Sequence, residues 1–376
     1  MFGRSLAALV ALAVVAQASA LQAQPNDQPP ANEPGPASAP PEPVIWHDTT
    51  FLFQQRATTQ TVGIGRDYQT NDPYYDWAFY LRPRLYLLER EKYSLSLRAQ
   101  GLVTYEFTDS NTTTDRNEVV LEDTILSFNP QYTPYSNGEY LTSVTFSAPR
   151  AVIPTSKASR GVGKILELGA RAFVEQNFPL REGDTVLPRG LLQARLGYAY
   201  TFTNANVPEN DDLNRARVDM NGHLVSNDQL NGAALADHGV YLHGILGADV
   251  LRDRIGFKFE GGIDWAHKYA LAEDSTLTID TGPVEVPVDE DAPRVSVINY
   301  LDASVEFRFG RDLVSLYLGY ENITSQIGPD GQRRGFFWSP DAKFYLSVEL
   351  RLDSLYTTVA RPSPPPSTAA LASPQY

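Results

Sequence analysis

The chain has 376 residues and carries 45 acidic against 31 basic side chains, for a formal net charge of −14 at neutral pH. This surplus of negative charge argues against a nucleic-acid partner, because nucleic-acid phosphates attract basic surfaces. The chain has no cysteine, which excludes disulfides, thiolate metal sites and lipid attachment through an N-terminal cysteine.

Residues 1–20 have the pattern of a secretory signal peptide. Arg4 gives a positive start, the apolar core "LAALVALAVVA" follows, and the small residues of "ASA" at 18–20 fit a cleavage site. The core is too short to span a bilayer. We therefore expect these residues to be removed and the rest of the chain to be exported.

Two Pro-rich segments flank the expected folded body. Residues 21–45 form a Pro/Ala-rich linker and residues 357–376 a Pro-rich C-terminal tail, and neither composition can build a core. After residue 20 no stretch reaches the roughly 18 consecutive apolar residues of a membrane helix. The body, residues 46–356, is therefore expected to fold without membrane helices.

Within the body, apolar and polar side chains alternate with the two-residue period of a β-strand. In "YSLSLRAQGLVTYEF", residues 93–107, one alternate set is almost wholly apolar and the other almost wholly polar. This alternation predicts about twelve strands, with ten to fourteen possible. They lie near residues 49–63, 75–89, 93–108, 118–130, 140–148, 165–178, 191–204, 238–251, 255–269, 295–310, 313–323 and 342–355.

Short and long links mostly alternate between these strands. Three of the links are only "REK", "RDR" and "RD", whereas links on the other side include "DSNTTTDRN" and residues 205–237. The links near 131–139 and 179–190 are longer than the others in the short class. Transmembrane barrels show this asymmetry, with short periplasmic turns and long extracellular loops.

Strand length favours a membrane barrel over a secreted β-sandwich or lectin-like domain, which is the alternative. Soluble strands average about five or six residues, whereas a tilted strand needs roughly 9–11 residues to cross a bilayer. Lipid tolerates no unpaired sheet edge, so we predict an all-β, closed antiparallel transmembrane β-barrel. Aromatic residues near strand ends fit interfacial girdles: Tyr74, Tyr75, Trp77, Trp265, Tyr269, Trp338, Phe344 and Tyr356.

The chain resembles bacterial outer-membrane β-barrel proteins of the porin-like kind in three features: the signal peptide, the alternating strands, and the alternation of short and long links. The resemblance covers nearly the whole mature body. It implies a place in the cell outer membrane, insertion by the barrel insertion machinery, and contact with outer-membrane lipids and lipopolysaccharide. The chain departs from the family at its end, because "FYLSVELRLDSLY" is followed by some twenty further residues instead of closing the chain on an aromatic. The insertion signal would then be internal.

The polar sides of the strands would line a wet lumen and are the predicted functional surface. We expect charged side chains there to pair with one another. The predicted lumen-lining residues are Arg82, Arg84, Arg98, Glu106, Arg171, Arg195, Lys258, Glu260, Asp264, Glu306, Arg308, Glu349 and Arg351.

Catalytic and metal motifs are weak. His243 falls on a polar strand face, where a lumen hydrogen bond is the expected role. "HLVSN" supplies His223, Ser226 and Asn227, the residue types of outer-membrane phospholipases, but it lies in the longest predicted loop with no matching motif around it. We predict no catalytic residue, metal site or cofactor.

The loops carry charge but no spaced ligand motif. The acidic loops at 209–212 and 272–293 are expected to be solvated tips rather than Ca²⁺ sites. Within the second of them, "TLTID" and "VEVPV" could form a hairpin. Lys157, Arg160 and Lys164 in "IPTSKASRGVGK" could meet anionic lipopolysaccharide.

Three functions remain open, in this order: a porin-like channel for small polar solutes, a structural or surface-recognition barrel acting through its extracellular loops, and an outer-membrane lipid acyl hydrolase. The sequence favours a role without catalysis, and no oligomeric state is predicted.

Overall fold

A computed structural model describes residues 45–360, apart from residues 60, 63–73, 109–116, 138–139, 181–188, 205, 207–216, 219–223, 226–233, 252–253, 271–275, 280–281, 286–293, 311–312 and 328–332. The predicted signal peptide, nearly all of the linker and the last sixteen residues of the tail lie outside the described residues.

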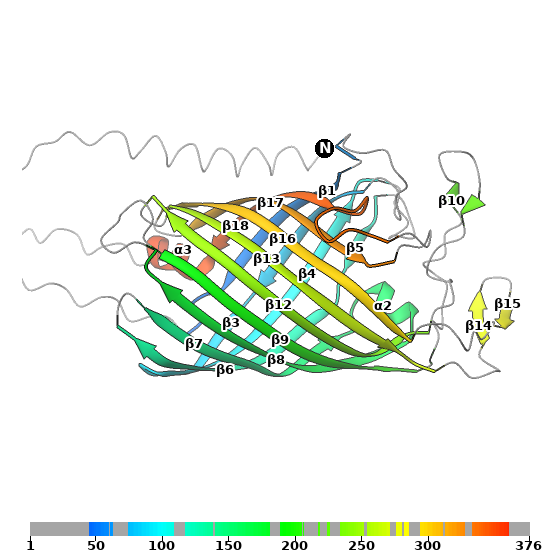
Figure 1. The fold of residues 1–376 in the computed structure, drawn as a ribbon, viewed down its shortest axis with the longest axis horizontal. Helices are drawn as coiled ribbons and strands as arrows, with labels where there is room; N and C mark the ends of the chain where they lie inside the picture. The colour runs from blue at the N-terminus through cyan, green and yellow to red at the C-terminus, as the bar shows by residue number, and fades with distance from the viewer. Residues whose placement is uncertain are drawn as a thin grey trace, which may run out of the picture. The chain divides into compact units, whose positions relative to one another are not determined.

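One closed antiparallel sheet contains twelve wall strands among the described residues (Figure 1). Two wall strands are each split in two, β2 and β3 at Pro83, and β5 and β6 before Thr124. The elements of the wall are β1 (Thr50–Thr58), β2 (Tyr75–Arg82), β3 (Arg84–Glu89), β4 (Tyr93–Glu106), β5 (Val119–Leu121), β6 (Thr124–Ser136), β7 (Leu141–Ile153), β8 (Lys164–Phe178), β9 (Arg189–Thr203), β12 (Ala236–Val250), β13 (Ile255–Lys268), β16 (Val295–Phe309), β17 (Val314–Ser325) and β18 (Lys343–Arg351).

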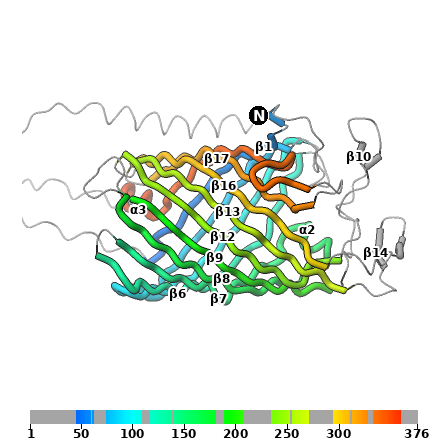
Figure 2. The backbone as a smooth tube through the Cα atoms, viewed as in Figure 1, coloured from blue at the N-terminus to red at the C-terminus, as the bar shows by residue number. Residues whose placement is uncertain are grey.

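Each wall strand pairs with its neighbours in chain order, and the first strand closes the ring. Phe53 of β1 lies opposite Phe79 of β2 on one side and Val348 of β18 on the other. The tube view in Figure 2 shows these strands running obliquely around the wall. Because β1 and β18 are neighbours, no edge strand is left for lipid to meet, as the sequence predicted.

The outer face of the wall is apolar and exposed. Leu97, Leu246 and Leu318 have 42%, 58% and 50% of their surface exposed, although all three lie within strands. Inward positions hold buried polar side chains instead, such as Ser96 and Thr104 of β4. This pattern is the reverse of a soluble protein and matches a wall that faces lipid outside and polar groups inside.

A charge on the outer face is expected to destabilise the barrel. Leu97→Arg places a cation among lipid chains on the outer face of β4, at a cost of up to roughly 2–4 kcal/mol. Gln100→Glu, which places a charge on the inward side of the same strand among arginine side chains, is the control and should cost little. Urea unfolding of the protein in lipid vesicles measures both changes. Equal losses of stability for the two variants would contradict the assignment of the faces.

The last predicted strand is wrong at its end. It was expected to continue to residue 355, but β18 ends at Arg351 and the helix α3 (Leu352–Ala360) follows. Leu352, Leu355, Tyr356 and Val359 have the spacing of one helical face, which a strand would have divided between two sides. The helix also crosses the expected start of the Pro-rich tail at residue 357.

Smaller elements lie in the links. The short helix α2 (Lys157–Gly161) is capped by Ser156, whose hydroxyl accepts a hydrogen bond from the Ser159 amide. The predicted hairpin is present as β14 (Thr276–Ile279) paired with β15 (Gly282–Glu285). Two further short strands, β10 (Arg217–Val218) and β11 (Leu224–Val225), also pair. Among the described residues, no helix is long and apolar enough to cross a membrane.

Candidate functional site

The inward side chains are segregated by charge around the ring. Chain order is ring order here, so β3 to β9 form one half of the wall and β12 to β18 most of the other half. Arginines dominate the first half, and most of the carboxylates lie in the second. We call these halves the arginine wall and the carboxylate wall.

A cavity of about 360 Å³ lies against the arginine wall. Its lining includes neutral polar side chains such as Gln100, Ser127 and Asn129. The charged side chains that line it are Arg84, Arg98, Arg150, Arg171, Arg195 and Glu175. Five cations therefore face one carboxylate, and we call this space the arginine cavity.

Three of these arginines have carboxylate partners outside the lining. The pairs are Arg84 with Asp48 at 3.4 Å, Arg150 with Glu167 at 2.9 Å, and Arg195 with Glu260 at 2.8 Å. The third pair joins the arginine wall to the carboxylate wall at their boundary.

Arg98 and Arg171 are different. Within the described ranges, neither guanidinium has a carboxylate within ion-pair distance. Arg171 lies over the ring of Tyr241, with the guanidinium carbon 4.8 Å from the ring centroid, and Arg98 is exposed to the lumen. The guanidinium charges of Arg98 and Arg171 can therefore interact with water or with a solute in the cavity.

The carboxylate wall is held together by bridging cations. Lys258 Nζ lies 2.7 Å from Glu260 and 3.0 Å from Asp302. His243 lies between Glu260, at 3.2 Å, and Asp264, at 2.7 Å. This is the lumen hydrogen bonding expected for His243, and it leaves the five groups mutually satisfied.

Four other predicted lumen residues, Arg82, Glu306, Arg308 and Glu349, also lie in ion pairs. Arg308 contacts Glu306 at 2.7 Å and Asp249 at 2.9 Å, and Arg82 contacts Glu349 at 3.6 Å. These ion pairs lie in the half of the barrel nearer the short links. Such closed pairs explain their charges without a ligand.

A buried ion pair lies toward the long-link end of the lumen. Arg56 of β1 donates two hydrogen bonds to Asp76 of β2, whose side chain is fully buried. Tyr74 donates its hydroxyl to the same carboxylate at 2.8 Å. Glu106, also predicted to face the lumen, is 1% exposed and accepts a hydrogen bond from Thr108.

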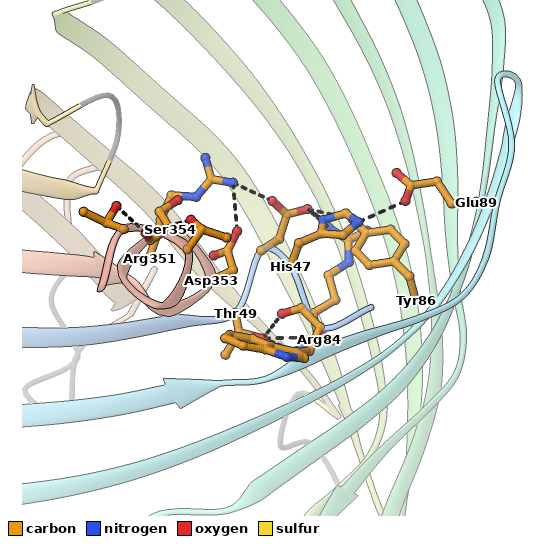
Figure 3. A network of polar contacts seen from close by, with 12 residues as sticks. His47, Thr49, Arg84, Tyr86, Glu89, Arg351, Asp353 and Ser354 are labelled. Carbon is orange, nitrogen blue, oxygen red and sulfur yellow. Dashed lines mark hydrogen bonds and ion pairs between the residues drawn. The ribbon is translucent and has the colours of Figure 1, made fainter. Parts of the chain in front are cut away.

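The segment before β1 is fastened to the wall at the short-link end (Figure 3). Asp48 accepts a hydrogen bond from the hydroxyl of Tyr86 at 2.7 Å and pairs with Arg351 at 2.8 Å. His47 stacks on the Tyr86 ring, with centroids 3.8 Å apart, and its Nε2 lies 3.1 Å from Glu89. We call this group the Asp48 latch; it ties β3 and β18 together across the closure of the ring.

The latch keeps Asp48 ionised. Partial burial alone would raise the pKa of Asp48, but the Tyr86 hydrogen bond and the charges of Arg84, His47 and Arg351 outweigh it. The pKa of Asp48 is therefore below its usual value. Its contribution to stability is complete above the usual Asp pKa of about 4 and is lost as the pH falls through the lower folded value.

Removing this carboxylate should have a modest, pH-dependent effect. Asp48→Ala is expected to lower the free energy of unfolding by about 1 kcal/mol, since the side chain is partly exposed. The difference from the unaltered protein should be constant from about pH 5 to 8 and shrink below about pH 4. Urea unfolding at several pH values measures it, and a difference that grew as the pH fell would contradict the assignment.

Some lumen residues were missed from the sequence. The predicted strand at 140–148 ends before Arg150, whereas β7 continues to Ile153 with a register shift before Arg150. Arg56 and Asp76 lie in strands whose alternation is weak or interrupted. The acyl-hydrolase residues His223, Ser226 and Asn227 and the acidic loop at 209–212 lie outside the described residues.

Comparisons with known proteins find similar solved structures but no family for this chain. No protein-family model matches the chain, and no curated protein matches it. Among solved structures, it is similar to an outer-membrane channel from Pseudomonas putida F1, at 10% identity and a TM-score of 0.47, over 85% of this chain and 99% of that one. It is also similar to the NanC porin, at 7% identity and a TM-score of 0.34, over 81% and 99%, and to the KdgM porin, at 7% and 0.31, over 80% and 98%. Similarity at these identities and TM-scores does not indicate which solute this chain would carry.

Proposed function

Because this chain is an outer-membrane β-barrel, we propose that it is a channel for small polar solutes and that it passes anions in preference to cations. The observation that carries this proposal is the pair of uncompensated guanidiniums, Arg98 and Arg171, in the arginine cavity. A barrel with a purely structural role has no need of unneutralised charge inside its wall, where leaving a charge unpaired is costly. Water and a passing anion would both lower that cost.

The two walls together favour this reading. Cations on one side and carboxylates on the other create a field across the lumen, and low-dielectric walls focus such fields. Within the arginine cavity the cationic side dominates, so a small anion would be attracted where the five arginines converge. Arg side chains suit carboxylate and phosphate groups because their planar fork can donate two parallel hydrogen bonds.

Planar-bilayer recording of the refolded protein tests the proposal. We expect discrete conductance steps and, across a KCl gradient, a reversal potential with the sign of anion preference. Heat-denatured protein at the same concentration is the control. An absence of steps would contradict the channel and would favour the structural or surface-recognition barrel. Steps with cation preference would keep the channel but contradict the role of the arginine cavity.

A further inference from the structure

The long link between β17 and β18 folds back onto the outside of the barrel. In Figure 1 it is the orange segment beside β17. Asn322 of β17 donates from Nδ2 to the carbonyl oxygens of Gly335, at 3.0 Å, and Phe336, at 2.9 Å. Tyr320 donates its hydroxyl to the carbonyl oxygen of Phe337 at 2.7 Å. Tyr320 and Asn322 alternate with inward residues and share the outward side of β17 with Leu318, so the link lies on the lipid side.

We call the described part of this link, residues 326–327 and 333–342, the outer clasp. The wall beneath it breaks the apolar pattern of the outer face. Asn299, Asn322 and Thr324 point outward but are 5%, 0% and 6% exposed. Gln326 of the clasp donates from Nε2 to Asn299 at 3.2 Å. Polar groups facing lipid without partners would be costly, and the clasp covers these outward amides and supplies hydrogen-bond partners for them.

The clasp encloses a basic cavity. Its volume is about 380 Å³, and its lining is Asn299, Gln326, Arg333, Arg334, Gly335 and Phe336. Arg333 is exposed, and Arg334 is 7% exposed beneath it. Among the residues that the structure describes, those that line this cavity include two arginines and no carboxylate.

Aromatic side chains project beside the cavity. Phe337 is 68% exposed and Trp338 is 42% exposed. The clasp lies at the long-link end of the wall, which in outer-membrane barrels is the extracellular end. Exposed aromatic residues are typical of the membrane interface, where an apolar ring meets acyl chains and headgroups. Cationic and aromatic groups therefore meet at the depth of the outer-leaflet headgroups.

We propose that the outer clasp binds a phosphorylated glycolipid of the outer leaflet. Arg333 and Arg334 would hold a phosphate in the basic cavity, and Phe337 and Trp338 would pack against the upper part of the acyl chains. Arginine pairs with phosphate through parallel hydrogen bonds, and basic pockets on membrane proteins recognise lipid headgroups in this way. This site is independent of the lumen and of any transport through it.

In the other basic loop, Arg160 is exposed and donates to the carbonyl oxygen of Ser156, but both lysines are paired with carboxylates. Lys157 pairs with Glu118 at 2.6 Å, and Lys164 lies 3.4 Å from Asp123 and 3.2 Å from Glu167. The lipopolysaccharide contact that the sequence suggested near these lysines is therefore less favoured than one at the clasp. Lys157 provides a matched control, because it is also a cation in a long link.

Native mass spectrometry of the refolded full chain in detergent, titrated with bis-phosphorylated lipid A, tests the proposal. Lipid A with both phosphates removed is the second probe. We expect binding that depends on the phosphates, with the Kd raised about tenfold or more in Arg333→Gln/Arg334→Gln and raised less in Arg333→Gln alone. Lys157→Gln should bind as the unaltered protein does. The single variant keeps the test decisive if the double variant fails to fold, since Arg333 is exposed.

Three results would overturn the proposal. The first is equal affinity for lipid A with and without phosphates. The second is equal affinity of Arg333→Gln and the unaltered protein. The third is a dimer that forms without lipid and disappears in Phe337→Ser, which would make the clasp a contact between two copies of this chain.

Discussion

Replacing Arg98 and Arg171 by glutamate is expected to convert the lumen from anion preference to cation preference. Both side chains line the arginine cavity, and neither has a carboxylate partner in the described part of the chain. Each unit charge acts on an ion about 4 Å away with roughly 1 kcal/mol even at the dielectric constant of water. Two reversals together should therefore change the ratio of anion to cation permeability by about tenfold or more, since about 1.4 kcal/mol is a factor of ten.

The reversal potential across a KCl gradient measures this change. Arg90→Glu/Arg254→Glu is the matched control, because it makes the same change in net charge at two exposed short turns. It should leave the sign of the reversal potential unchanged. If the control altered selectivity as much as the cavity variant, the overall charge of the protein, and not the arginine cavity, would set the preference.

Removing the carboxylate of Asp76 is expected to cause the largest loss of stability. The side chain is fully buried and is bonded to both Arg56 and Tyr74. Asp76→Ala leaves the Arg56 cation, itself only 16% exposed, without its partner. Breaking a buried pair from one side costs roughly 3–5 kcal/mol. Urea unfolding in lipid vesicles, followed by tryptophan fluorescence, measures the loss.

Two controls separate the charge effect from a loss of packing. Asp264→Ala removes a carboxylate whose side chain is 33% exposed, and it should cost clearly less. The double variant Arg56→Met/Asp76→Leu removes both charges and should recover much of the stability, because a buried pair is often replaceable by apolar residues. A double variant as unstable as Asp76→Ala would show that shape, not charge, determines the loss.

Strand alternation was enough to predict the wall of this barrel. In β4, Leu97 and Val103 are exposed outward, while Arg98 and Gln100 line the lumen cavity. Neighbouring strands of this ring are also neighbours in the chain. The separation of the arginine wall from the carboxylate wall therefore follows from the order in which the inward residues occur in the sequence. Which arginine has a partner does not follow, because it depends on how far each side chain reaches across the lumen.

The departures from the predicted strands have local causes. Leu352 to Val359 keep an apolar pattern that continues from β18, but its spacing changes from two residues to that of a helix. The outer clasp could not be inferred, since nothing in the alternation says that a link folds back along the wall. The sequence feature that marks the clasp is a pair of polar residues, Asn299 and Asn322, at outward strand positions where apolar residues are expected. These two residues are explained only once their partners in the clasp are known.

The outer clasp and α3 lie at opposite ends of β18, and each carries exposed aromatic or aliphatic side chains. β18 has nine residues, or roughly 30 Å along the strand at about 3.3 Å per residue. At a tilt of about 40°, it rises only about 23 Å. This rise is close to the apolar band of about 25 Å that outer-membrane barrels present to lipid. On this side of the wall the clasp and α3 therefore bound the hydrocarbon layer, and lipids with long acyl chains should slow the refolding of the protein through hydrophobic mismatch.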